Sequence, residues 1–232
     1  MSIVLPFRAL RPVRSHVHAV AAPPYDVLST TEARALAAQN PLSFLHVEKS
    51  EIDVSDADGV EDRRIYERAK ANLGELVRRN ILQREAVPAF YLYRLRMAGH
   101  IQTGIVACVS VAEYESGLIK RHELTRPDKE RERVYNIDTV GAQTGLVFMT
   151  YRGREGIDRL AERIAAARPE YDFTAPDGVA HTVWVVTEPL QMREVAEEFA
   201  RVDALYIADG HHRAAAAAAV ARLRRARHPG ER

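Results

Sequence analysis

The chain has little of what marks secreted, membrane or nucleic-acid-binding proteins. It contains a single cysteine, Cys108, which excludes an internal disulfide framework and fits the reducing cytoplasm. No stretch approaches the roughly 20 apolar residues that a membrane-spanning helix needs. Its 33 basic and 32 acidic residues nearly cancel, so no overall field attracts nucleic acid. We therefore expect a cytoplasmic protein that binds neither membrane nor nucleic acid.

The composition is that of a globular protein. With 232 residues, 47% of them hydrophobic and 28% charged, the chain is long enough for one large domain or two small ones. Alternating strand and helix patterns predict an α/β (α+β) fold, with a mixed, partly antiparallel sheet and flanking helices. We place a possible boundary between residues 1–88, an N-terminal segment that forms either a separate lobe or part of the core, and residues 89–232.

Individual elements follow from local patterns. Ser29 begins a helix cap, residues 42–47 have the apolar run of a strand, and 90–96 with 103–111 form an antiparallel hairpin. Cys108 in that hairpin is expected to be a small buried side chain, and Trp184 to lie in the core.

The chemically densest pattern lies at residues 205–213. A short apolar run ends at Asp209 and Gly210, followed by His211, His212 and Arg213 at the start of an alanine-rich helix. This predicts a strand, a tight turn and a helix N-terminus, where free N–H groups and the helix dipole favour a phosphate. The alternative is that Asp209 merely caps the helix while the histidines face solvent.

A second dense stretch covers residues 120–129, where a strand ends and a helix begins at Pro127. Seven of these ten residues are ionisable, among them His122 and Glu123. A solvated charge run would also produce this pattern.

At these positions the chain resembles known proteins. The sequence Asp209-Gly210-His211-His212-Arg213 looks like the phosphate-binding motif of the ParB/sulfiredoxin superfamily, in the variant carried by free-serine kinases. With Pro6 to Pro12, Pro23 to Val27 and the pair His122-Glu123, the whole chain is similar to a large bacterial and archaeal domain-of-unknown-function family, number one thousand and fifteen. Members of that family usually continue further, so the resemblance implies a ParB/sulfiredoxin-like nucleotide-binding core truncated at its C-terminus.

The resemblance implies a function and its site residues. It points to an ATP- or ADP-dependent kinase with Mg²⁺, which transfers phosphate to a small hydroxyl substrate, L-serine first. The implied catalytic residues are His122, Glu123 as general base, and Asp209, which is also the candidate Mg²⁺ ligand. Gly210, His211, His212 and Arg213 would hold the nucleotide. The spacing between Glu123 and Asp209 is much longer than in a minimal kinase of the superfamily.

Substrate contacts are expected from two further segments. Arg8 or Arg11, in a proline-bounded opening, would clamp a carboxylate with a guanidinium fork. Asp26, on a stiff loop after Pro23-Pro24, and Thr125 beside the His-Glu pair are the other candidates. Ordinary surface arginines and a turn acid explain these residues equally well. A homodimer is one assembly that the sequence leaves open.

Two other function classes stay open. A non-catalytic nucleotide-binding regulatory module needs the phosphate site without Glu123. A metal-dependent hydrolase would use His122, Glu123, Asp209, His211 and His212, although none of the histidines has helical zinc-ligand spacing. Sulfiredoxin chemistry needs a cysteine where this chain has His211.

Overall fold

The computed structural model describes residues 2–57 and 59–228, so residues 229–232 of the predicted second region lie outside the described residues. Contacts divide the chain into two compact units, each built from three segments. Unit 1 comprises Met1–His18, Ile81–Glu113 and Tyr151–Leu205, and unit 2 comprises Ala19–Asn80, Tyr114–Thr150 and Tyr206–Arg232. The sequence-based boundary after residue 88 stays a prediction.

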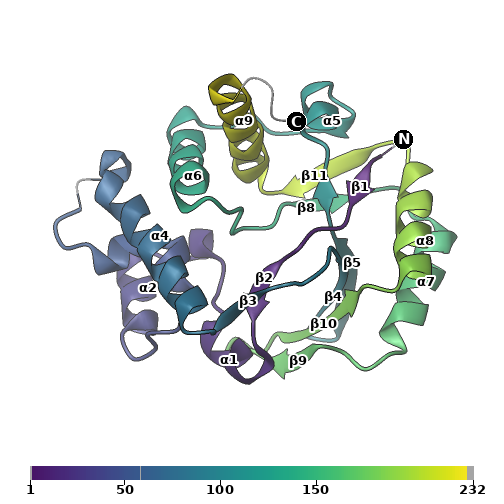
Figure 1. The fold of residues 1–232 in the computed structure, drawn as a ribbon, viewed down its shortest axis with the longest axis horizontal. Coiled ribbons are helices and arrows are strands. Elements are labelled where there is room, and N and C mark those ends of the chain that lie inside the picture. Colours follow the sequence, from purple (N-terminus) through teal and green to yellow (C-terminus); the bar gives the residue numbers. More distant parts are fainter. Residues whose placement is uncertain (1, 58, 229–232) are drawn as a thin grey trace. The chain divides into compact units, whose positions relative to one another are not determined.

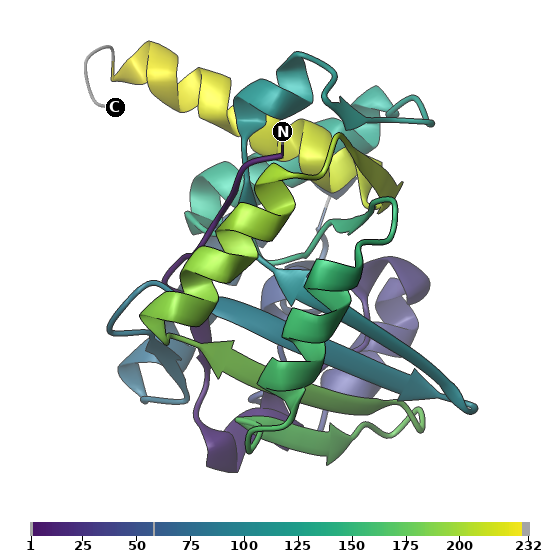
Figure 2. The ribbon, with the colours of Figure 1, turned by 90° about the vertical axis from the view of Figure 1, so that its right-hand side faces the viewer.

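Unit 1 is organised on a four-stranded antiparallel sheet. Its strand order is β5 (His100–Val106), β4 (Phe90–Met97), β10 (Ala180–Val186) and β9 (Tyr171–Thr174). Helix α7 (Glu155–Ala165) packs on β4 and β10, and α8 (Pro189–Ala200) packs beside α7. Figure 2 shows both helices across one face of this sheet. Trp184 is buried, as predicted.

Two short strand pairs complete unit 1. Strand β1 (Val4–Leu5) pairs with β6 (Cys108–Val109), and β2 (Leu10–Pro12) pairs with β3 (Leu82–Arg84). The expectation of a buried Cys108 is wrong, because its side chain is exposed. Its cross-strand partner Leu5 is also 57% exposed, and such partners share one face of the ladder. That face of the strand pair is therefore open.

Unit 2 combines helices with a three-stranded sheet in the order β7 (Ile119–Lys120), β11 (Leu205–Asp209) and β8 (Phe148–Thr150). Helix α9 (His211–Arg227) packs along α6 (Pro127–Val140), and α6 packs against α4 (Arg63–Arg78), as Figure 1 shows. The alanine run makes the first contact close, since Ala216 is fully buried beside Ile137.

The helices at the start of unit 2 show one confirmed prediction and one error. The capping box of Ser29 and Glu32 begins α2 (Thr30–Ala37), as predicted. Residues 42–47 do not form a strand, because the side chains of Asn40 and Ser43 each accept a hydrogen bond from the backbone N–H two residues further along and turn the chain into α3 (Leu45–Glu48). A short apolar run cannot by its period distinguish a strand from a buried helix.

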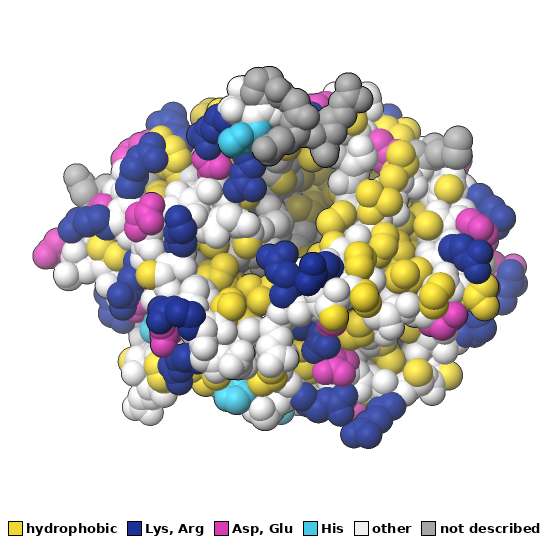
Figure 3. Space-filling view, viewed as in Figure 1, with side chains coloured by type: hydrophobic (Ala, Val, Ile, Leu, Met, Phe, Trp, Pro, Cys, Tyr) yellow, Lys and Arg dark blue, Asp and Glu magenta, His cyan; other side chains and the backbone are white. Residues whose placement is uncertain are grey.

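Short helical turns join these elements: η1 (Arg14–His16), α1 (Val17–Val20), η2 (Tyr25–Val27), η3 (Ser50–Asp53), η4 (Gly59–Glu61) and α5 (Val111–Glu115). No helix among residues 2–57 and 59–228 is long and apolar enough to cross a membrane. On the face drawn in Figure 3, basic side chains are interspersed with acidic and apolar ones.

His181 makes the stability of unit 1 depend on pH. Burial lowers the pKa of His181 below its ordinary value of 6.5, so the unfolded chain takes up a proton more readily than the folded one. Stability that is present above pH 6.5 should be lost as the pH falls through 6.5 towards the folded-state pKa. Urea unfolding between pH 7.5 and 5 measures this slope.

His181→Gln should flatten that slope, because glutamine takes up no proton in this range. Val183→Ala on the same strand changes no ionisable group and serves as the control. An unchanged slope in His181→Gln would contradict the assignment.

Candidate functional site

The predicted strand, turn and helix are all present at Asp209 to Arg213. Strand β11 is the central strand of its sheet and ends at Asp209, and α9 begins at His211. Gly210 between them has φ 90° and ψ 33°, a left-handed conformation that favours glycine. A glycine at the N-cap has no side-chain oxygen for the N–H groups of the first helical turn, which leaves them for a ligand or water.

Arg213 folds back over this turn. Its guanidinium forms an ion pair with Asp209 and donates to the carbonyl oxygen of Leu146, and its Nη2 lies 3.7 Å from an oxygen of Asp26. A Cβ on Gly145 or Gly210 would come within 3.0 Å of the Arg213 side chain. Both glycines therefore make room for the arginine, which is 16% exposed.

His211 points inward. It is 4% exposed, its Nδ1 lies 3.4 Å from a carboxylate oxygen of Glu123, and its ring meets that of His122 edge-on with 4.5 Å between centroids. Burial, followed by the neighbouring His122, lowers the pKa of His211. A neutral imidazole with its Nδ1 proton facing Glu123 fits this geometry. Its Nε2 is buried and has no hydrogen-bond partner among the described residues.

His212 joins the two chemically dense stretches. Its Nε2 accepts a hydrogen bond of 3.0 Å from the backbone N–H of Arg126, the N-cap residue of α6. Thr125, the residue before Arg126, donates a hydrogen bond of 2.9 Å from its hydroxyl to the carboxylate of Glu130. The start of α6 is thus tied to the start of α9, a contact that the sequence did not predict because Arg126 looks like any other residue of a charge run.

The structure brings most of the predicted residues together in unit 2. His122, Glu123, Asp26 and Asp209 join His211 and Arg213 through the contacts above, and the carboxylates of Glu123, Asp26 and Asp209 stay 57%, 45% and 66% exposed. Acids that reach solvent beside a helix N-terminus can meet a ligand there.

Arg8 and Arg11 belong to unit 1, where other partners engage them. Arg8 donates to the carbonyl oxygen of Glu85 at 2.7 Å. Arg11 pairs with Glu85 and with Glu170, and donates to the hydroxyl of Tyr171 at 2.6 Å. The guanidinium groups of both arginines thus have partners within unit 1. Their role as a substrate clamp stays a prediction.

A sequence profile of the family described as Protein of unknown function (DUF1015) matches residues 4–232. The chain belongs to this family. Neither the curated proteins nor the solved structures give a match.

The side chains of the DUF1015 site suit some kinds of metal site better than others. Within the part of the chain that the structure describes, no group of three or more His, Cys, Asp or Glu side chains could hold a metal ion alone. Mg²⁺ is usually held by one or two carboxylates together with substrate phosphates and water. The exposed carboxylates of Asp209 and Asp26 fit that more modest requirement.

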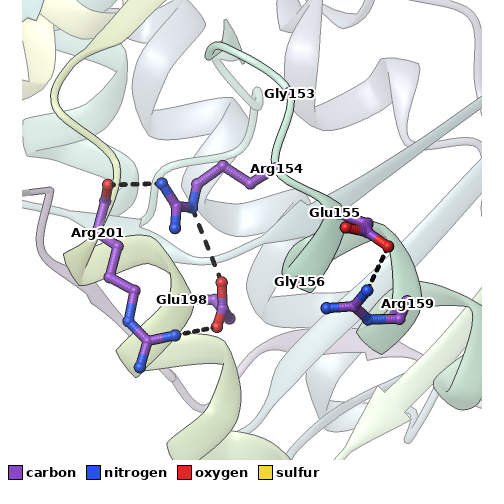
Figure 4. A pocket seen from close by; sticks show the side chains of 7 residues that line it. All are labelled: Gly153, Arg154, Glu155, Gly156, Arg159, Glu198 and Arg201. Carbon is purple, nitrogen blue, oxygen red and sulfur yellow. Dashed lines mark hydrogen bonds and ion pairs between the residues drawn. The ribbon is translucent and has the colours of Figure 1, made fainter.

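A hollow of about 410 Å³ in unit 1 contains none of the predicted residues. Figure 4 shows that its charges pair with one another: Arg201 with Glu198, and Arg159 with Glu155. Arg154 donates to the carbonyl oxygen of Arg201 at 3.1 Å. We place the candidate site at the β11–α9 turn, where buried and exposed polar groups of the DUF1015 protein converge.

Gly210→Ala tests the dependence of the turn on glycine. Gly117→Ala is the matched control, because Gly117 has φ 76° but nothing within 4 Å of an added Cβ. The control should lower the free energy of unfolding by about 1–2 kcal/mol, the cost of a left-handed alanine. Gly210→Ala should cost more, since its Cβ also displaces Arg213. Equal losses in chemical denaturation would refute the packing argument.

Proposed function

We propose that this protein binds a nucleotide at the β11–α9 turn and transfers its terminal phosphate to a small hydroxyl compound, with L-serine as the leading acceptor. One observation carries the proposal: Glu123, Asp26 and Arg213 meet around the N-terminus of α9, although they come from three distant segments. The resemblance of the motif to that of free-serine kinases supports the same chemistry. The donor would be ATP or ADP with Mg²⁺.

The phosphates would bind at the first turn of α9. Backbone N–H groups and the positive end of the helix dipole attract an anion there, and Arg213 adds a planar set of donors. This guanidinium faces Asp209 and Asp26. A phosphate would exchange places with one of these carboxylates. Asp209 and Asp26 are the residues that would hold Mg²⁺, whose chemistry is to neutralise the charge of the phosphates.

Glu123 is the candidate general base. Its side chain is 57% exposed, and its carboxylate lies 3.4 Å from Nδ1 of the buried His211, which restricts its orientation. It would accept the proton of the acceptor hydroxyl while the hydroxyl oxygen bonds to phosphorus. The bond from phosphorus to the bridging oxygen breaks, and its electron pair stays on the nucleotide product.

The contact between Glu123 and His211 also favours a second candidate function. If Glu123 serves only to hold His211, the same site is a non-catalytic nucleotide-binding module. Such a module would bind nucleotide without transferring phosphate.

Nucleotide binding should raise the thermal stability of the protein. A ligand at 100 times its dissociation constant adds about 2.7 kcal/mol to the free energy of unfolding. We expect a thermal shift with ADP or ATP plus Mg²⁺, and none with either in Arg213→Ala. Arg222→Ala on the same helix removes the same charge from an exposed pair with Glu115 and should keep the shift. No shift with ADP, ATP, CTP or AMP would rule out the proposed site in this chain.

Glu123→Gln should separate binding from catalysis. Loss of the base should lower phosphate transfer to L-serine by about 10²–10⁴-fold, with the nucleotide thermal shift retained. Glu61→Gln is the matched control, because Glu61 is 58% exposed in a surface pair with Arg131 and should leave transfer unchanged. If the wild type binds nucleotide but transfers no phosphate, the non-catalytic module is favoured.

A further inference from the structure

Helix α6 carries a buried arginine that the site described so far does not use. Arg133 is 7% exposed, and its Nη2 donates to the carboxylate of Glu132 at 2.6 Å. Its Nη1 lies 3.8 Å from Oε2 of Glu48 on α3. Burying a charged guanidinium costs free energy, so the buried position of Arg133 on α6 needs a physical explanation.

A gain in folding stability does not explain the buried ion pair between Glu48 and Arg133. Both carboxylate oxygens of Glu48 are inaccessible to solvent and accept no hydrogen bond from the residues that the structure describes. Buried ion pairs generally stabilise a fold no better than well-packed apolar side chains would. The pair between Glu48 and Arg133 therefore fits a role in fixing one arrangement of the chain.

A third neighbour of Arg133, the ring of Tyr25, indicates which segment this ion pair holds in place. The carbon at the centre of its guanidinium lies 4.1 Å from the centroid of the Tyr25 ring, well within cation–π distance. Tyr25 opens the short turn η2, which is preceded by two prolines and, among the described residues, has one backbone hydrogen bond, from the N–H of Val27 to the carbonyl of Pro24 at 3.3 Å. A turn with so little backbone bonding depends on its side chains for its position.

The residue after Tyr25 is Asp26, whose carboxylate lies 3.7 Å from Nη2 of Arg213. Two arginines thus hold neighbouring residues of η2: Arg133 contacts the ring of Tyr25, and Arg213 lies beside the carboxylate of Asp26. A shift of the Tyr25 ring would move Asp26 with it, because the fixed φ of Pro24 and the helical turn make this segment stiff.

We infer that Arg133 is a positioning residue: held by Glu48 and Glu132, it fixes the Tyr25 ring and so sets where Asp26 meets Arg213. The positioning of Asp26 stands on the contacts alone. Its effect on nucleotide affinity rests on the proposed function.

Hydrogen exchange of the backbone amides of residues 25–29 tests the positioning directly. Arg133→Lys keeps the charge opposite Glu48 but loses the flat guanidinium face over Tyr25. The double variant Glu48→Gln with Arg133→Met removes the charges of Glu48 and Arg133 and so avoids an unpaired carboxylate at Glu48, while Glu132 keeps its ion pair with Lys129. Arg131→Met on the same helix breaks an exposed pair with Glu61 and is the control.

We expect exchange at residues 25–29 to become about tenfold faster in both Arg133 variants, with α9 and the control unchanged. The dissociation constant of Mg²⁺-ADP should rise in the same two variants. Unchanged exchange in both would overturn the inference. Faster exchange with unchanged affinity for Mg²⁺-ADP would overturn its link to the site. If the wild type binds no nucleotide, the proposed function fails, and the exchange rates alone decide the role of Arg133.

Discussion

The site depends on one left-handed residue and the arginine folded over it. Gly210 joins β11 to α9 in a left-handed conformation, and Arg213 in the first turn of α9 reaches back to Asp209 at the end of the strand and to the carbonyl of Leu146. A cation at a helix N-terminus is electrostatically unfavourable. The carboxylates of Asp209 and Asp26 offset that cost, and a bound anion would offset it in the same way.

Behind this turn, unit 2 places polar groups where a core would normally be apolar. His211 and Arg133 are both more than nine-tenths buried, and each faces a glutamate. The alanines of α9 allow this arrangement, because their small side chains let α6 approach closely. That approach brings the N–H of Arg126 to His212 and joins the two dense stretches of the sequence. Small residues on one helix thus control the geometry of polar residues on the next.

The sequence predicts local structure best where a chemical signal is specific. The capping box at Ser29, proline at the start of α6 and glycine between β11 and α9 are confirmed because each acts through its own backbone neighbours. The strand expected at residues 42–47 fails, since Ser43 and Asn40 compete for the backbone with side-chain hydrogen bonds. The exposed Cys108 shows the same limit, because an apolar run does not reveal which face of a two-stranded ladder is covered.

For the candidate site, the sequence by itself determined the residue types and the turn that presents them: a strand end, a glycine, and His, His and Arg on the first helical turn. Only the tertiary structure decided which distant groups meet them. Asp26 and Glu123 reach the turn, whereas Arg8 and Arg11 bind partners within unit 1. The burial of His211 and the contact of Arg133 with Tyr25 have no sequence signal, because each depends on packing between segments tens of residues or more apart. Local hydrogen bonding is encoded by neighbours in the chain, while burial and charge pairing are set by neighbours in space.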